Sequence, residues 1–436
     1  MRQKELSRVA GPAVLLICLL PGIAAGRAQD VIQKGETLNL GKCIQTALEH
    51  LPALLASRAT SEADKSLVRQ AEAAYYPQID WSSSIGRSSV GPRSSLGFKT
   101  ISTTYNSYST GLNLSQTIFD FGRTPTQVRI QKLNFSASTS DVETASQQAV
   151  FNVKQSYYGV LQAKHNRDVA AEALRQYQLH LEQAQGLYDV GLQPKYDVTK
   201  AAVDLGNAKV NLIKAQNAVK LTLAELNNAM GVTGTLDFEV EDILSFEIYD
   251  ISLEDALARA YRNKPELASV AAKRQAAESS ITLAKTAFFP TLAGTASYDY
   301  AGNAFPLSRG WSVGLSLNLS VFSGFQTTAQ VAEARANLEV LLANEEAARQ
   351  SIYLAVQQAY LNLKQAEDLV PVAQLNVTAA QENFEIATGS YKEGVGDPIQ
   401  VADAAAALVG AKLAYNQALY DCQVARASLD LAMGLR

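Results

Sequence analysis

Two hydrophobic patterns alternate along the chain, one typical of β-strands and one typical of long helices. From Trp311 to Val321, apolar residues alternate with small or polar residues at every position. This period of two predicts a strand with one apolar face. Residues 112–115 show the same alternation over a shorter stretch. Strands of this kind are typical of membrane β-barrels, although a half-buried hairpin in a soluble protein would have the same pattern.

The helical pattern is a heptad repeat, which predicts coiled-coil packing. Apolar residues recur at spacings of three and four from Val198 to Ala229, and again from Val401 to Ala432. A sustained repeat of this kind imposes a left-handed supercoil on neighbouring helices. Cys422 occupies one of the repeat positions, so we expect a small packed side chain there rather than a reactive thiol.

The lengths of the helical stretches predict a rod. Stretches of about residues 125–189 and 327–391 are predicted to run as continuous helices despite Pro371 in the second, and each would be roughly 100 Å long. The stretches of about 44–76 and 197–230 are each about half as long, so end to end they match the long helix. Each half of the chain thus predicts a rod two helices wide. Pro371 is expected to kink the second long helix without ending it.

The order of these elements occurs twice. Landmarks recur at an offset of 213 residues as far as the aromatic-proline pairs at 76–77 and 289–290, and at an offset of 203 from residues 111 and 314 onward. Such self-similarity is best established before any other fold argument. It predicts a mainly helical protein with a small membrane β part, whose four β-strands and two long plus four shorter helices form two structural repeats.

The duplication also sets the expected domains. They are a first repeat at 29–231 (strands about 77–120, helices about 125–230), a connector at 232–252, and a second repeat at 253–436 (strands about 290–323, helices about 327–434). The connector should lie beside the rod near its middle. At the N-terminus, cations at positions 2, 4 and 8 precede a short apolar core and small residues, which predicts a signal peptide at 1–28. Ile17 before Cys18 disfavours lipid attachment.

Composition excludes several classes of function. The formal net charge of −4 argues against nucleic acid as a partner. The two cysteines after the signal, Cys43 and Cys422, form no CxxC pattern, and the histidines are scattered, so neither a disulfide framework nor a metal site is expected. We find no catalytic motif, and therefore expect neither an enzyme nor a cofactor.

Size then limits where such a chain can function. A rod of roughly 100 Å is about three times the thickness of a bilayer's hydrocarbon core, so most of it must lie in water. Four strands cannot close a membrane barrel, because single-chain barrels begin at about eight strands. If the strands are membranous, the protein must oligomerise. The alternative is a secreted periplasmic coiled-coil scaffold or adhesin without a pore, which would not fractionate with the outer membrane.

The chain resembles the TolC-like outer-membrane factor family of efflux and type I secretion systems. The resemblance rests on the duplicated order of elements, the aromatic-proline entry into each first strand, and the hairpin turns at 188–192 and 391–395. It implies a homotrimer in the cell outer membrane and its lipid, with a 12-stranded barrel continuous with a helical periplasmic tunnel. It also implies a passive conduit served by a periplasmic adaptor (membrane fusion protein) and an inner-membrane pump. Drugs, metal ions, polysaccharide and polypeptide all remain open as cargo.

The resemblance assigns two groups of residues near the helix tips. The adaptor-docking turns would be Val190, Gly191, Leu192, Gly394, Val395 and Gly396. The glycines at 191 and 394 also have a simpler interpretation as helix C-caps. The periplasmic aperture, which family members close with acids and a tyrosine, would involve Asp403, Asp197, Tyr391, Gln400 and Lys200.

This sequence departs from the family's aperture pattern at several places. Gln400 stands where an acid is common, Gly396 where a basic residue can occur, and Lys200 at the position equivalent to Asp403. Residues 397–400 also read as a capping box, which would explain Gln400 without any gating role. Asp197 lies in the first turn of a helix, where an acid complements the helix dipole.

Overall fold

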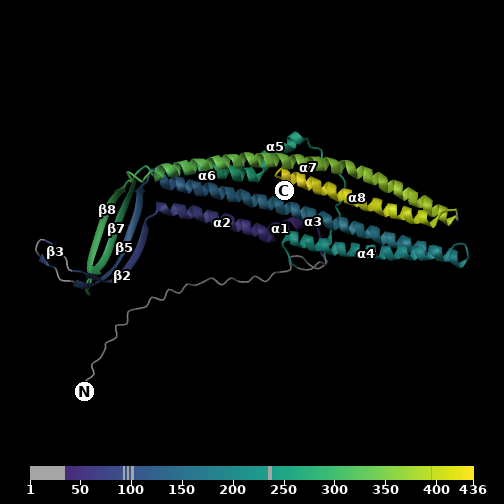
Figure 1. Cartoon of the computed structure of the whole chain (residues 1–436), viewed down its shortest axis with the longest axis horizontal. Helices are drawn as coiled ribbons and strands as arrows, with labels where there is room; N and C mark the ends of the chain where they lie inside the picture. The colour runs from purple at the N-terminus through teal and green to yellow at the C-terminus, as the bar shows by residue number, and fades with distance from the viewer. Residues whose placement is uncertain (1–34, 92–93, 96–97, 100–102, 234–237, 394) are drawn as a thin grey trace, which may run out of the picture.

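The computed structural model describes residues 35–91, 94–95, 98–99, 103–233, 238–393 and 395–436. The predicted signal peptide at 1–28 and the turn residue Gly394 lie outside these ranges. Figure 1 shows a long helical rod with a curved sheet at one end. None of the described helices is long and apolar enough to cross a membrane.

Two helices run almost the whole length of the rod. They are α3 (Arg123–Asp189) and α7 (Gln326–Lys392), each of 67 residues, which corresponds to roughly 100 Å. Helix α7 continues through Pro371, so this proline does not end it. The half of the rod that is remote from the sheet also contains α4 (Lys195–Met230) and α8 (Pro398–Ala432). The half next to the sheet contains α2 (Pro52–Glu72) and α6 (Pro265–Thr286).

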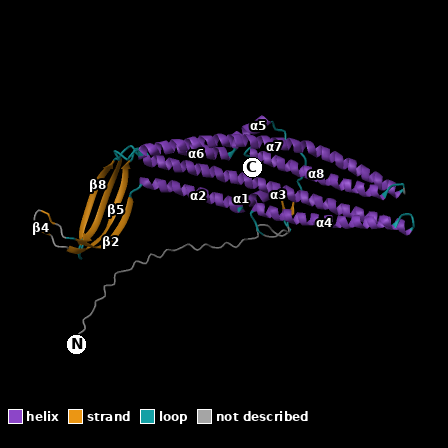
Figure 2. Ribbon diagram, in the orientation of Figure 1, coloured by secondary structure: helices purple, strands orange, loops and turns teal. Residues whose placement is uncertain are grey.

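The helices form a layer with two distinct edges. In the remote half, α3 packs against α4 and α8, and α8 packs against α7. In the half next to the sheet, α3 packs against α2 and α6, and α6 against α7. Figure 2 shows α2 and α4 along one edge of the layer and α7 along the other. The edge helices therefore have neighbours on one side only.

The first helix of each repeat is divided in two, unlike the single helix predicted for about 44–76. Helix α1 (Leu40–His50) is separated from α2 by Leu51, and α5 (Leu253–Asn263) is separated from α6 by Lys264. Both linking residues are extended, with ψ near 115°. A proline follows each of them, and proline disfavours the helical conformation of the residue before it. There are consequently six shorter helices in the described residues rather than four.

The heptad repeats pack as expected. Every predicted repeat position in α4 and α8 is buried or half-buried. Cys422 is buried on this seam, and burial raises the pKa of its thiol. It therefore stays protonated and acts as a small core side chain, as the repeat predicted.

The connector between the repeats crosses the middle of the rod. Its short strand β6 (Glu239–Val240) pairs in parallel with β1 (Thr37–Leu38). The Tyr157 hydroxyl of α3 donates to the backbone carbonyl oxygens of Leu38 and Glu241, at 3.2 and 2.7 Å. Further on, the Glu367 carboxylate of α7 accepts the backbone N–H of Tyr249 at 2.8 Å. Both long helices are thus tied to the connector.

The sheet is antiparallel, with the order β2-β5-β7-β8. Its strands are β2 (Gln78–Val90), β5 (Thr103–Phe119), β7 (Thr291–Gly302) and β8 (Ser308–Asn318). Two dipeptides, β3 (Ser94–Ser95) and β4 (Phe98–Lys99), pair with each other between β2 and β5. Each repeat supplies one hairpin, and strands β2 and β8 are left at the open edges.

Candidate functional site

The strand register sorts the side chains of the sheet onto two contrasting faces. Side chains alternate along each strand, so residues directly paired across strands share a face. One continuous row across all four strands consists of Trp81, Leu112, Tyr298 and Trp311. The next row on the same face, nearer the helices, consists of Ile79, Leu114, Ala296 and Val313. This face is apolar and aromatic.

The opposite face is polar. Its rows contain Asp80, Asn113, Ser297 and Ser312, followed by Ser82, Gly111, Asp299 and Gly310. On the other face, Trp81, Trp311 and Leu315 are more than two-thirds exposed. In water an exposed apolar face of this size would be unfavourable. The sheet is therefore suited to separate lipid on one side from water on the other.

A second group of aromatic rings surrounds the junction of sheet and helices. Phe121 lies 4.7 Å from Phe119 and 5.1 Å from Phe289, and Phe322 lies 5.7 Å from Phe325, measured between ring centroids. Phe121 and Phe325 both have positive φ, which costs about 1–3 kcal/mol for a bulky residue. That cost supports a role for aromatic rings at this level.

The two aromatic levels lie toward the two ends of the apolar face. In β5, Leu112 of the tryptophan row and Phe119 of the junction are seven residues apart, which corresponds to roughly 18 Å across a bilayer for a strand tilted by about 40°. The apolar band of outer-membrane barrels is about 25 Å high, so the described strand covers most of that height. Tyr108 of β5 also lies on the apolar face, where it pairs with Ile85, whereas Tyr105 pairs with Ser88 and lies on the polar face.

The other end of the rod carries the predicted docking turns. Helix α3 ends in a Schellman motif: Leu192 N–H donates to the Leu187 carbonyl and Gly191 N–H to the Tyr188 carbonyl, both at 2.9 Å. Gly191 has φ +77°, so its interpretation as a C-cap is correct. Val190 and Leu192 are exposed, and Val395 is 83% exposed. The turns therefore carry solvent-exposed apolar side chains at the end of the rod.

Gly396 has a steric role that the sequence did not show. A Cβ atom on this residue would lie 2.6 Å from the backbone nitrogen of Tyr391. The N–H groups of Val395 and Gly396 both donate to the Ser390 carbonyl, which holds the turn tightly against the end of α7. A basic residue, which can occur here in the family, would not fit without moving this backbone.

Beneath the turns, three helices meet around Tyr391. Its ring lies 5.5 Å from the imidazole of His180 in α3, and these side chains are 2% and 9% exposed. Asp197 of α4 is 8% exposed. Burial raises the pKa of Tyr391, and the charge of Asp197 adds to this. Neither the Tyr391 hydroxyl nor Nδ1 of His180 has a hydrogen-bond partner among the described residues.

The remaining predicted aperture residues lie nearer to solvent. Asp403 and Gln400 are exposed on α8. Lys200 pairs with Asp204 at 3.1 Å, and this bond raises the pKa of Lys200, with the charge of Asp403 adding to the effect. Asp397 caps α8 by accepting the N–H of Ile399 at 2.9 Å. Asp403 therefore interacts electrostatically with Lys200 of α4, whereas Asp197 is buried between helices.

Sequence reasoning missed His180, Asp204 and Tyr177 in this cluster. Tyr177 and His180 are three residues apart on α3, and burial raises the pKa of the former, with Asp204 contributing. No local motif distinguishes these residues, because their proximity depends on how the ends of α3, α4 and α7 align. The only sequence signal was that His180 is polar within a helical stretch.

The burial of His180 makes the packing of the tip dependent on pH. Burial lowers the pKa of His180 from 6.5; Asp204 and Asp197 favour the cation and Lys200 opposes it. Below about pH 6.5 an opened tip therefore binds the proton before the packed tip does, and the packed tip loses stability as the pH falls. Amide hydrogen exchange around residues 176–184 should show protection that is full at pH 7.5 and reduced at pH 5.5.

His180→Phe should abolish this pH response, because the ring is kept and the titrating group is removed. His165→Phe is the matched control, because His165 also lies on α3 but is away from the tip, hydrogen-bonded to Asp242 of the connector at 2.7 Å. The control should respond to pH as the unaltered protein does. An unchanged pH response in His180→Phe would show that another group controls the tip.

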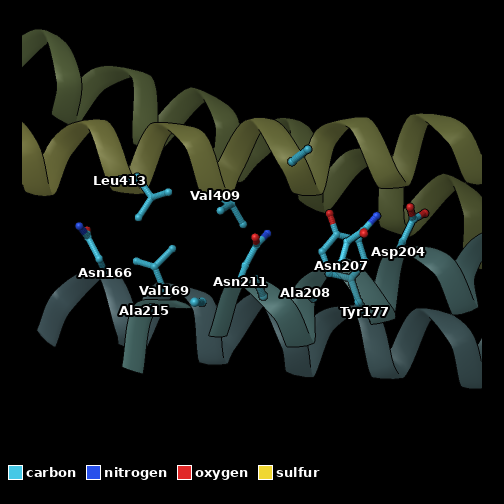
Figure 3. A pocket seen from close by; sticks show the side chains of 13 residues that line it. Asn166, Val169, Tyr177, Asp204, Asn207, Ala208, Asn211, Ala215, Val409 and Leu413 are labelled. Carbon is cyan, nitrogen blue, oxygen red and sulfur yellow. The ribbon is translucent and has the colours of Figure 1, made fainter. Parts of the chain in front are cut away.

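A cavity of about 450 Å³ lies between the α3–α4 hairpin and helix α8 of the α7–α8 hairpin. Its lining includes Tyr177 and Asp204 of the cluster just described. Figure 3 shows Asn166 and Val169 of α3 across it from Val409 and Leu413 of α8. Asn416 of α8 donates to the Asn166 side-chain oxygen at 2.9 Å, so a polar contact bridges the hairpins at one end. The two hairpins contact each other through α3 and α8. The cavity separates α4 from α8.

Comparison with known proteins bears on the whole architecture. A family model described as outer membrane efflux protein matches residues 43–232 and, separately, residues 256–435. The two matches coincide with the two repeats and cover most of the chain. The chain belongs to the outer membrane efflux protein family.

Individual relatives cover nearly the full length. The chain is 25% identical to the outer membrane efflux protein BepC of Brucella suis, over 99% of this chain and 90% of that protein. It is 24% identical to the cation efflux system protein CusC of Escherichia coli O157:H7, over 90% of this chain and 85% of that protein. The Campylobacter jejuni CmeC outer membrane channel shares the fold, with a TM-score of 0.79 at 20% identity over 91% of this chain and 85% of that chain.

Family membership confirms the resemblance found in the sequence. This protein is the outer-membrane channel component of an efflux system. Channels of the TolC-like family are trimers that work with an adaptor and an inner-membrane pump. The geometry of the sheet and the tips can now be interpreted in that setting.

Proposed function

We propose that three copies of this chain close into one conduit, with a 12-stranded barrel in the outer membrane and a helical tunnel in the periplasm. The observation that carries this proposal is the four-stranded sheet with one apolar face, one polar face and two unpaired edges. In lipid, unpaired strand edges would leave backbone groups unsatisfied at several kcal/mol each. Pairing β8 with β2 of the next copy removes every edge.

The helical layer supports the same closure. Large apolar side chains are exposed along both edge helices: on α4 they are Tyr196, Val203, Val210, Ile213 and Leu221, and on α7 they include Leu354, Leu361, Val372, Leu375 and Ile386. Different surfaces on the two edges favour a head-to-tail contact, which closes into a ring when the rotation fits. α4 of one copy would then cover α7 of the next.

We also propose that the helix tips gate this conduit. Asp403 is exposed on α8, so three copies would bring three carboxylates together where the tunnel narrows. Tyr391, His180 and Asp197 would hold the hairpins in the closed arrangement by packing. The cavity between α3 and α8 would give the α7–α8 hairpin room to move when an adaptor and pump engage the apolar turns at Val190, Leu192 and Val395.

Cell fractionation tests this function against the scaffold alternative. The full-length protein should be exported to the outer membrane, require detergent for extraction, and retain a mass three times that of its chain. The exposed apolar face of the sheet disfavours a soluble scaffold. Release with the periplasmic fraction as a monomer would favour that alternative.

A further inference from the structure

A cluster of one arginine and two tyrosines interrupts the apolar face of the sheet at the end that is remote from the helices. Between the phenylalanine rings at the junction and the row of Trp311, the described strands carry no charged side chain on this face. The first is Arg309, which is exposed and lies two residues beyond Trp311. Two residues correspond to roughly 7 Å along a strand, which places Arg309 just outside the aromatic row.

Two tyrosines lie beside this arginine on the neighbouring strand. Arg309 pairs in register with Tyr300, and Tyr298 lies diagonally opposite on the same face, paired with Trp311. The hydroxyl groups of Tyr298 and Tyr300 are 3.4 Å apart, and their rings meet edge to face at 5.7 Å. Asp299, the acid between them in sequence, lies on the polar face, paired with Gly310. Arg309 and the two tyrosines therefore share the apolar face of the sheet, and the acid does not.

The chemistry of this cluster fits a phosphate. A guanidinium binds phosphate oxygens in a bidentate manner, and tyrosine hydroxyl groups can donate further hydrogen bonds. The proposed conduit, on which this step rests, has its helices in the periplasm, so the hairpin loops face outward and the cluster lies at the headgroup level of the outer leaflet. We propose that Arg309, Tyr298 and Tyr300 form a binding site for the phosphate groups of the outer-leaflet glycolipid, lipid A.

The two tryptophans of the chain make this site measurable. Trp81 and Trp311 are the only ones present and both lie in the aromatic row, so fluorescence of the detergent-solubilised full-length protein reports on it. Bisphosphorylated lipid A should bind, and Arg309→Gln should weaken it at least about tenfold, the factor that corresponds to about 1.4 kcal/mol. Arg309→Lys, which keeps the charge and loses the bidentate geometry, should have an intermediate effect.

Arg87→Gln is the matched control. Arg87 lies on the same face of β2, paired with Asn106, and is four residues, roughly 13 Å along the strand, beyond Ser83 in the row of Tyr300 and Arg309. Its loss should therefore leave the affinity for lipid A unchanged. The site assignment is overturned by equal binding of dephosphorylated lipid A, by equal competition from phosphatidylglycerol or inorganic phosphate, by an unaffected Arg309→Gln, or by an equal loss in Arg87→Gln.

A separate measurement distinguishes failure of this site from failure of the membrane assignment. Lipids brominated in their acyl chains should quench Trp81 and Trp311 in the reconstituted protein, whether or not Arg309 is replaced. Quenching without a phosphate-dependent signal would remove only the lipid A site. Absence of quenching in every variant would overturn the membrane sheet as well.

Discussion

Ile213→Asp abolishes the assembled channel if the exposed stripe on α4 is the contact between copies. Ile213 is 65% exposed in the single chain, and in the ring it would be covered by α7 of the neighbour. Burying an aspartate there removes about 1.5–3 kcal/mol of apolar burial at each contact and leaves an unpaired charge that costs several kcal/mol more. The solubilised variant should be monomeric by light scattering, and its level in the outer membrane should fall sharply.

Two further variants make the result specific. Ile213→Leu keeps an apolar side chain of the same size and should assemble normally. Leu375→Asp changes the opposite edge, on α7, and should disrupt assembly as Ile213→Asp does. A trimer that survives both aspartate substitutions would place the contact between copies elsewhere.

Asp403→Ala should raise single-channel conductance several-fold in a planar bilayer. In the proposed trimer, three Asp403 carboxylates would form a narrow ring with a strong local field, and the substitution would remove both the charge and the bulk of the side chain. Asp197→Ala should also raise conductance, but by a different route, because it loosens the packing around Tyr391 and His180. It should therefore reduce the protection of the tip from hydrogen exchange, whereas Asp403→Ala should not.

Asp421→Ala provides the control for the gate. Asp421 is also an exposed acid on α8, but it lies eighteen residues, roughly 27 Å along the helix, beyond Asp403, so its replacement should leave the conductance nearly unchanged. If Asp403→Ala conducts as the unaltered protein does, Asp403 does not form the gate.

Sequence patterns predicted the elements that depend on local periodicity. The strict alternation from Trp311 to Val321 predicted β8, although the strand begins three residues earlier and ends at Asn318. The heptads of α4 and α8 predicted which residues are buried. The same reasoning missed the breaks at Leu51 and Lys264, although Pro52 and Pro265 were visible as repeat landmarks. Their meaning for the helix, a residue forced out of the helical conformation, is a local effect that sequence could have shown.

The candidate site was harder to predict because it depends on contacts between distant segments. Asp197 reads as an ordinary first-turn acid, and only the meeting of α3, α4 and α7 buries it beside Tyr391. His180 has no partner within its own helix that would mark it. The steric role of Gly396 likewise requires knowledge of where the turn folds back onto α7. For Asp197 and His180 the missing information is how the helices of the rod align. For Gly396 it is the conformation of the turn that returns to Ser390 and Tyr391.

Electron cryo-microscopy of the detergent-solubilised full-length protein tests the central claim most directly. The account predicts a threefold ring in which β8 pairs with β2 of the next copy and α4 lies against the neighbouring α7, with a continuous channel from barrel to tips. Particles that lack this ring, or a ring in which the strand edges remain unpaired, would contradict it.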